Sequence, residues 1–204
     1  MSQPHPLETV EVQSMSRHAL LLRGAMAAGA VYGATAVSPF VRRAFAQGKM
    51  GDVDVLNFAL TLEFLETAFY ERGAELKLSR DVRSQAKRFG AEEAEHVEAL
   101  MGTIKDLGGT PAKKPSFDFG VTDEASFLKL AQTLEDTGVS AYNGAGPSIS
   151  SKEVLAAAGS IVQVEARHAA VIRLLRDQSP APKAFDTPMT TAQVNKAVAP
   201  LIQG

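Results

Sequence analysis

The chain has 204 residues, no cysteine and a formal net charge of −2, and 45% of its residues are hydrophobic. This length allows one domain with a full apolar core. The absence of cysteine excludes disulfides, thiolate nucleophiles and cysteine-ligated zinc or iron–sulfur sites, and the balanced charge gives no indication of a nucleic-acid partner. Aromatic residues make up only 6% and tryptophan is absent, which favours an all-α chain of closely packed helices over a β-sandwich.

Residues 1–46 have the layout of an export signal. A basic start at Ser16–His18 is followed by a weakly hydrophobic stretch from Gly24 to Val41 and then by Ala44-Phe45-Ala46. A basic start, an apolar middle and a small-x-small end are typical of a cleaved signal. The segment resembles a twin-arginine signal, from which His18 departs because a second arginine is expected there. We expect cleavage after Ala46 and a periplasmic protein, with no stable membrane span because the apolar stretch is short and rich in Gly and Ala.

Four helical segments are expected in residues 47–176. Apolar residues recur at three- and four-residue steps in the first segment, and glycines and prolines end the later ones. We predict helices over residues 52–75, 79–107, 122–143 and 150–176. Asp52 or Asp54 is expected to cap the first helix and Thr122 the third. The remaining tail, residues 177–204, contains prolines and is expected to form only a short helix over residues 191–198.

The links between these helices are unequal in length. The first and third links are short, so each should join an antiparallel hairpin. The middle link, Gly108 to Val121, contains two prolines, and its fourteen extended residues reach about 45–50 Å. A helix of about 27 residues is about 40 Å long, so this link can travel along the whole bundle. The prediction is a four-helix bundle of two antiparallel hairpins joined by a long crossover.

Only two histidines follow the export segment, and each has a glutamate three residues before it. Glu93 precedes His96, and Glu165 precedes His168. Residues three apart on a helix share a face, so each pair can contribute to one metal centre.

The two hairpins form an internal repeat displaced by 72 positions. Glu63, Glu93 and His96 recur as Glu135, Glu165 and His168, and Tyr70 recurs as Tyr142. Two copies of one hairpin that face each other would create a site with pseudo-twofold symmetry.

The repeated residues predict a site for two metal ions. One glutamate from each of two helices and a Glu-x-x-His pair from each of the other two is the ligand pattern of di-iron and dimanganese carboxylate bundles. The predicted ligands are Glu63, Glu93, His96, Glu135, Glu165 and His168. Four buried carboxylates repel one another, whereas two divalent cations balance their charge. Mixed nitrogen and oxygen donors favour iron or manganese over magnesium or calcium.

Two tyrosines are expected to support this site without binding metal. Tyr70 and Tyr142 each follow their glutamate by seven residues, close to two helical turns. Each therefore lies on the face of its glutamate, and its side chain can lean back toward the site as a hydrogen-bond partner.

Other glutamates on the same helices have a simpler interpretation. Solvated faces or ion pairs are expected for Glu66, Glu71, Glu92, Glu95 and Glu98. Glu66 is the main competitor of Glu63 as the first ligand, because it lies one turn later on the same helix. The repeat partner of Glu66 is Gly138, whereas that of Glu63 is Glu135, so Glu63 is the predicted ligand.

These motifs resemble the ferritin-like superfamily, whose bacterioferritin and rubrerythrin members share Glu-x6-Tyr, Glu-x-x-His, Glu-x6-Tyr and Glu-x-x-His in this order. Residues 55–66 and 134–143 more closely resemble exported bacterial ferritin-like domain proteins related to plant desiccation-associated proteins. The resemblance covers about residues 52–204 and implies this fold and these ligands. Ala94 stands where bacterioferritin has its haem-ligating methionine, and rubrerythrin's four-cysteine iron site has no counterpart. No haem is therefore expected.

Three functions remain open on these grounds. The first is an oxidase-like di-iron protein that takes up ferrous iron and reacts with oxygen or peroxide, in stress protection outside the cytoplasm. The second is a dimanganese catalase-like enzyme. The third is a non-catalytic stress or envelope protein in which the metal is structural or absent. A homodimer is compatible with the sequence, whereas an iron-storage cage is disfavoured because the Pro-containing tail does not resemble ferritin's fifth helix.

Overall fold

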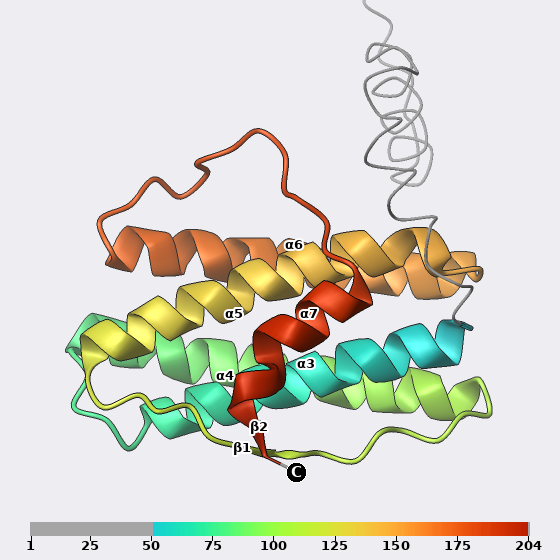
Figure 1. The fold of residues 1–204 in the computed structure, drawn as a ribbon, viewed down its shortest axis with the longest axis horizontal. Coiled ribbons are helices and arrows are strands. Elements are labelled where there is room, and N and C mark those ends of the chain that lie inside the picture. The colour runs from blue at the N-terminus through green and yellow to red at the C-terminus, as the bar shows by residue number, and fades with distance from the viewer. Residues whose placement is uncertain (1–50, 204) are drawn as a thin grey trace, which may run out of the picture. The chain divides into compact units, whose positions relative to one another are not determined.

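A computed structural model of the protein describes residues 51–203 (Figure 1). The predicted export signal, residues 1–46, lies outside the described residues. Within residues 51–203, none of the helices combines the length and the apolar character that a membrane crossing requires.

Four long helices form the bundle. They are α3 (Asp52–Gly73), α4 (Arg80–Asp106), α5 (Glu124–Ala145) and α6 (Lys152–Leu175). α3 pairs with α4 and α5 pairs with α6, and the two hairpins meet where α3 contacts α5 and α4 contacts α6. The predicted all-α bundle of two antiparallel hairpins is confirmed, and every predicted helix end lies within about two residues of the observed one.

The acidic residues at the start of α3 have different partners. The N-cap residue is Gly51, and the carboxylate of Asp54 accepts a hydrogen bond from the Gly51 N–H at 3.2 Å. The carboxylate of Asp52 instead accepts hydrogen bonds from the backbone N–H groups of Ser150 and Ser151, at 2.7 and 2.8 Å. Asp52 therefore ties the start of α3 to the start of α6, and neither aspartate is the N-cap of α3 itself.

The start of α5 differs by one residue from its prediction. Asp123, not Thr122, is the N-cap residue, and its carboxylate accepts a hydrogen bond from the Ser126 N–H at 2.8 Å. Aspartate accepts such a bond as well as threonine does, and it adds a negative charge at the positive end of the helix dipole.

The crossover between α4 and α5 runs along the bundle and is held by the end of the chain (Figure 1). Its strand β1 (Ser116–Phe117) pairs in antiparallel fashion with β2 (Ile202–Gln203). Between α6 and β2, the helix α7 (Thr191–Val198) packs on α5 and buries Val194 and Val198. Two short 3-10 helices, η1 (Gly146–Ser148) and η2 (Ala199–Leu201), follow α5 and α7.

The apolar core consists of two clusters that draw on different parts of α3. One is built around Phe69, Phe89 and Phe127, and the rings of Phe69 and Phe127 are stacked with centroids 4.7 Å apart. The other includes Leu60 and Ile104, which are fully buried. Glu63 lies between Leu60 and Phe69 in the sequence of α3, so its carboxylate has apolar packing on both sides and little contact with water.

Candidate metal centre

The six predicted metal ligands converge inside the bundle. Each of the four long helices contributes one fully buried glutamate: Glu63, Glu93, Glu135 and Glu165. The two histidines lie on α4 and α6. The three-residue spacing places each of them beside the glutamate of its own helix. His168 is 2% exposed, and the side chain of His96 is 12% exposed. Carboxylates are almost never fully buried unless they are paired or bind a cation.

The donor atoms divide into two groups that could each hold one metal ion. The first group is Glu63, Glu93, His96 and Glu165, and the second is Glu93, Glu135, Glu165 and His168. Within each group, the atoms that could bind an ion lie within 4.8 Å of one another. Glu93 and Glu165 belong to both groups, so the two positions are adjacent and share two carboxylates.

His96 faces three carboxylates through one ring nitrogen. Its Nδ1 atom lies 3.0 Å from Glu93 Oε2, 3.2 Å from Glu63 Oε2 and 3.2 Å from Glu165 Oε1. These are the other three members of the first group, so Nδ1 is the atom of His96 that could bind an ion there.

His168 has partners at both of its ring nitrogens. Its Nδ1 atom lies 2.8 Å from Glu93 Oε1 and 3.5 Å from Glu135 Oε2. Its Nε2 atom forms a hydrogen bond of 2.7 Å with Glu92 Oε2, and its ring stacks on that of Phe89 with centroids 4.0 Å apart. A carboxylate on the far ring nitrogen fixes the orientation and the tautomer of a metal-binding histidine.

Each tyrosine supports a glutamate of the other hairpin. The hydroxyl of Tyr70, on α3, donates a hydrogen bond to Glu135 Oε1 on α5. The hydroxyl of Tyr142, on α5, donates to Glu63 Oε1 on α3 at 2.5 Å. The two bonds cross between the hairpins, as the pseudo-twofold symmetry of the repeat requires. They hold the α3 and α5 carboxylates by one oxygen each.

Burial without metal makes most of these carboxylates hard to ionise. Burial raises the pKa of Glu63 to about 8, in spite of the opposing effect of its hydrogen bond with His96. Burial, followed by the charges of Glu63 and Glu93, raises the pKa of Glu165 well above its ordinary value. Burial also raises the pKa of Glu135. Several negative charges in one dry site are unfavourable unless cations accompany them.

Glu93 and the two histidines carry the charge in the metal-free site. Burial acts to raise the pKa of Glu93, but the neighbouring imidazole groups of His168 and His96 outweigh it and lower that pKa to about 2. Burial likewise acts to lower the histidine pKa values, and the surrounding glutamates raise them to about 12 for His96 and about 11 for His168. Two imidazolium groups therefore supply the positive charge that cations would bring.

Several buried polar atoms of the site make no well-directed hydrogen bond within residues 51–203, although some of them lie close to an ion-pair partner. They are Glu66 Oε2, Glu93 Oε1, Glu135 Oε2, both carboxylate oxygens of Glu165, and His168 Nδ1. Buried polar atoms are nearly always satisfied in folded proteins, so a cluster of unsatisfied ones indicates a missing partner. Carboxylate oxygens and imidazole nitrogens are donors that iron and manganese accept. The residues present therefore fit a pair of such ions.

Glu66 was expected on a solvated face or in an ion pair, and this expectation is wrong. Its side chain is buried, with 3% exposure, on the same side of α3 as Glu63. A Cβ atom on Gly138 would lie only 3.1 Å from Glu66 Oε1 and 3.2 Å from Glu165 Oε2. The glycine therefore leaves the space that the fifth carboxylate occupies. The signal in the sequence was the small residue at the repeat position of an acidic one.

Glu92 also contacts the site, from its edge. It accepts hydrogen bonds from Arg88 Nε at 2.9 Å and from His168. Its side chain is 31% exposed. The expected ion pair is the one with Arg88, and the buried His168 is a second partner of the same carboxylate. Glu95 and Glu98 lie on the exposed surface of α4 as expected.

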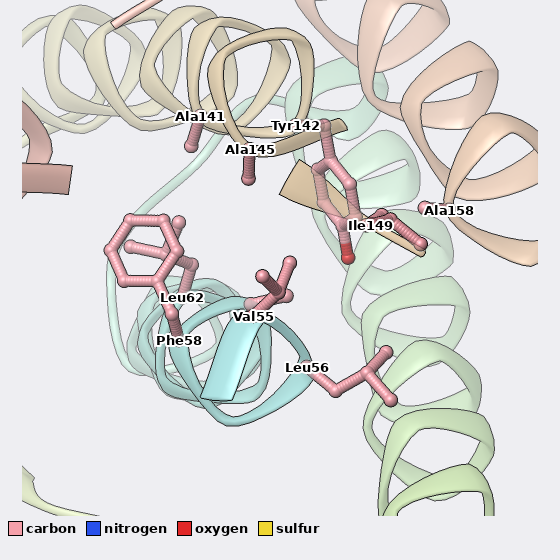
Figure 2. Close-up of a pocket in the computed structure, with 10 residues that line it drawn as sticks. Val55, Leu56, Phe58, Leu62, Ala141, Tyr142, Ala145, Ile149 and Ala158 are labelled. Atoms are coloured by element: carbon pink, nitrogen blue, oxygen red, sulfur yellow. The ribbon is translucent and has the colours of Figure 1, made fainter. Parts of the chain in front are cut away.

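Openings near the site differ between its two faces. Between α3 and α5, a narrow apolar pocket has room for about 10 Å³, about one water molecule, with Tyr142 and Ala145 facing Val55 and Leu62 (Figure 2). Between α4 and α6, two wider hollows of about 440 and 520 Å³ share Glu95, His96, Val164 and Arg167. We call these hollows the α4–α6 groove; His96 lines both of them, and His168 lines the smaller one.

Comparisons with known proteins agree with this fold. Protein rds1 of Schizosaccharomyces pombe is 27% identical over 153 residues, which cover 75% of this chain and 36% of that protein. The chain thus spans about a third of the length of this relative. The crystal structure of a conserved hypothetical protein, rv2844, from Mycobacterium tuberculosis superposes with a TM-score of 0.58 at 17% identity, covering 66% of this chain and 96% of that one.

The family comparison covers the part of the chain that carries the site. Residues 51–178 match the family described as "Ferritin-like domain". This range contains α3 to α6 and all six converging donors. The chain therefore belongs to the ferritin-like domain family.

Proposed function

We propose that this protein is a di-metal carboxylate protein that binds two ions, most favourably iron, and uses them to oxidise ferrous iron or to reduce oxygen or peroxide. The observation that carries the proposal is the pair of four-residue donor groups with Glu93 and Glu165 in common. In this assignment the two shared glutamates would contribute to holding both ions. Glu63 and His96 complete one position, and Glu135 and His168 complete the other.

Charge balance supports two divalent ions. Glu63, Glu93, Glu135 and Glu165 carry four negative charges when all are ionised, and two divalent cations cancel them. Binding requires neutral imidazole and ionised carboxylates, so both histidines and the protonated glutamates release protons as the ions enter. Tyr70 and Tyr142 each hold one oxygen of a terminal glutamate, which leaves its other oxygen for an ion.

The protein surroundings support redox chemistry on small molecules. When bound, a pair of iron ions supplies the electrons that reduce oxygen or peroxide. The two apolar clusters that flank Glu63 keep bulk water from the carboxylates. The pocket in Figure 2 has room for only about 10 Å³, so an organic substrate would not fit on that face.

Anaerobic loading with Fe(II) tests this proposal. Metal analysis after removal of free iron should give two ions per chain. Addition of oxygen or peroxide should then produce the near-ultraviolet and visible absorption of oxidised iron. The double variant Glu93→Ala/Glu165→Ala should lose both ions because it removes both shared donors, and Glu98→Ala, on the exposed surface of α4, should retain both. A wild-type protein that holds no metal after this loading would reject the proposal.

Manganese is the other metal that this donor set accepts. Metal analysis of the protein purified from its native host separates the two cases. Manganese as the native metal, together with oxygen release from hydrogen peroxide, would replace the iron assignment by a catalase-like one. Iron in the native protein, with no oxygen release, is the result that we expect.

We also propose that the protein is exported and acts against ferrous iron or peroxide outside the cytoplasm, in the manner of a stress protein. The basic, apolar and small-residue pattern of residues 1–46 supports this. Cell fractionation and N-terminal sequencing test it: we expect a periplasmic protein that begins at Gln47. Full-length protein in the cytoplasm would contradict the proposal without affecting the metal site.

A further inference from the structure

We propose that the two metal positions are unequal, so that the His168 position holds its ion tightly and the His96 position exchanges its ion through the α4–α6 groove. This inference rests on the proposed di-metal function. It predicts which metal position fills first. From the pseudo-twofold repeat alone, the two positions would have equal affinity.

Three residues of α4 fix the ring of His168. Glu92 accepts the hydrogen bond from Nε2 at 2.7 Å, Arg88 holds Glu92 from its other side at 2.9 Å, and Phe89 stacks on the imidazole with centroids 4.0 Å apart. The ring is 2% exposed. Nδ1 is thus already oriented toward Glu93 and Glu135. Binding of an ion therefore costs little conformational entropy of this side chain.

The repeat does not reproduce these three residues beside His96. A displacement of 72 positions takes Arg88, Phe89 and Glu92 to Ser160, Ile161 and Val164. Serine, isoleucine and valine cannot offer the carboxylate, the cation that holds it or the aromatic ring. Among the described residues, no protein group is placed to hydrogen-bond with His96 Nε2, although its Nδ1 has three carboxylates nearby.

The residues at these positions line the larger hollow of the α4–α6 groove, whereas Arg88, Phe89 and Glu92 line the smaller hollow together with His168. Ser160, Ile161 and Val164 border the larger hollow of about 520 Å³, and His96 lines it as well, whereas His168 is not among its lining residues. The side chain of His96 is 12% exposed. Rotation of its ring toward the groove would break no hydrogen bond at Nε2, so only the contacts of Nδ1 hold the ring between an ion in this position and the solvent.

Titration of the metal-free full chain with Co(II), monitored by calorimetry and by visible absorption, tests the inference. We expect two binding steps whose dissociation constants differ by at least about tenfold. His168→Ala should remove the tight step, and His96→Ala should remove the weak one. Two equal steps, or loss of the tight step in His96→Ala, would overturn the inference while leaving the di-metal function intact. No binding of Co(II) or Fe(II) at all would overturn both.

Variants of Glu92 test the cause. Glu92→Ala should weaken only the tight step, by about 10- to 100-fold as for other groups that hold a metal-binding histidine, and Glu92→Gln should restore part of the affinity. Glu98→Ala, a matched change on the exposed surface of α4, should change neither step. Val164→Glu places a carboxylate at the repeat position of Glu92 and should tighten the weak step. Unchanged affinities in both Glu92→Ala and Val164→Glu would contradict the mechanism.

Discussion

Glu66 is a buried carboxylate with one oxygen, Oε2, that lacks a hydrogen-bond partner in residues 51–203. Burial, followed by the charge of Glu165, raises its pKa well above the ordinary value. In the metal-free protein, Glu66 must therefore hold a proton or accept repulsion from its neighbours. The ionised form of Glu66 is therefore costly to folding in the metal-free protein.

Replacing Glu66 by glutamine should stabilise the metal-free protein. The amide keeps the shape of the side chain, removes a group that repels Glu165 and adds N–H donors toward it. We expect Glu66→Gln to raise the free energy of unfolding by about 1 kcal/mol at pH 8, with a smaller gain at pH 5, because lower pH makes protonation of the glutamate less costly. Denaturant unfolding with chelator present measures the change. The exposed control Glu71→Gln should be neutral, and destabilisation by Glu66→Gln would contradict this account.

The two tyrosines provide a second prediction at this scale. Tyr70 bonds with Glu135 and Tyr142 bonds with Glu63. Loss of such a supporting hydrogen bond typically weakens metal binding by about tenfold or more. We expect Tyr70→Phe to weaken the position at His168, and Tyr142→Phe to weaken the position at His96. Co(II) titration of both variants checks this. The opposite result, in which Tyr70→Phe weakens the position at His96 and Tyr142→Phe weakens the position at His168, would contradict the crossed hydrogen bonds.

The repeat explains which site residues could be predicted. Residues that recur after 72 positions were recognised because both copies carry the same chemistry. Glu66 and Glu92 were not, because their counterparts Gly138 and Val164 have none. Whether an acidic residue on a helix is buried depends on the space that the facing helix leaves. The space between two helices cannot be derived from a single sequence, even though it is Gly138, at the repeat position of Glu66, that provides it.

At the scale of elements, the segment after α6 is held to the bundle by backbone contact. The Met189 N–H donates to the Ser140 carbonyl of α5 at 2.9 Å. A Cβ atom built on Gly144 would lie 1.9 Å from the Met189 carbonyl oxygen. No side chain fits there without displacement of the segment, so Gly144 permits α7 to pack on α5.

Substitutions of two glycines distinguish the effect of this close contact on stability from the effect of helix propensity. Alanine in place of an interior helical glycine normally stabilises a helix by about 1 kcal/mol. Gly159→Ala in α6, where nothing lies within 4 Å of the added atom, should show that gain in thermal unfolding. Gly144→Ala should instead lower the melting temperature and expose residues 177–203 to limited proteolysis. Equal stabilisation by both substitutions would argue against the close contact with Met189.

Helices and hairpins could be predicted because they depend on local pattern and on link length. The length of the crossover predicted how the two hairpins are connected, since about fourteen extended residues can reach from one end of the bundle to the other. The pairing of Ser116–Phe117 with Ile202–Gln203 could not be predicted in this way. It joins strands of two residues that are far apart in the sequence, and neither strand has a hydrophobic alternation long enough to indicate it.

For the whole molecule, the buried site makes stability depend on pH. Burial raises the pKa of Glu63 from 4.5 to about 8. The surrounding glutamates raise the pKa values of His96 and His168 from 6.5 to about 12 and 11, although burial acts against them. These groups bind protons more tightly in the folded chain than in the unfolded one. The stability they contribute is therefore present at low pH and is lost as the pH rises above the unfolded-state values.

We expect the metal-free protein to be more stable at pH 5 than at pH 8, by more than about 1 kcal/mol. Glu93, with a pKa of about 2, acts in the opposite direction only below pH 4.5. Denaturant unfolding at both pH values, with chelator, measures the difference. Protein loaded with metal should not lose stability over this range, because the ions keep the ligands deprotonated in the folded state and the unfolded histidines bind protons instead. A metal-free protein that gains stability between pH 5 and pH 8 would contradict the account.

The proposed function requires that two ions bind between the same pair of glutamates. Anomalous diffraction at the absorption edge of iron, from crystals of the iron-loaded protein, tests it most directly. We expect two peaks about 3.5–4 Å apart, both within bonding distance of Glu93 and Glu165, one beside His96 and the other beside His168. A single peak, or no peak among these six side chains in crystals of protein that contains iron, would contradict it.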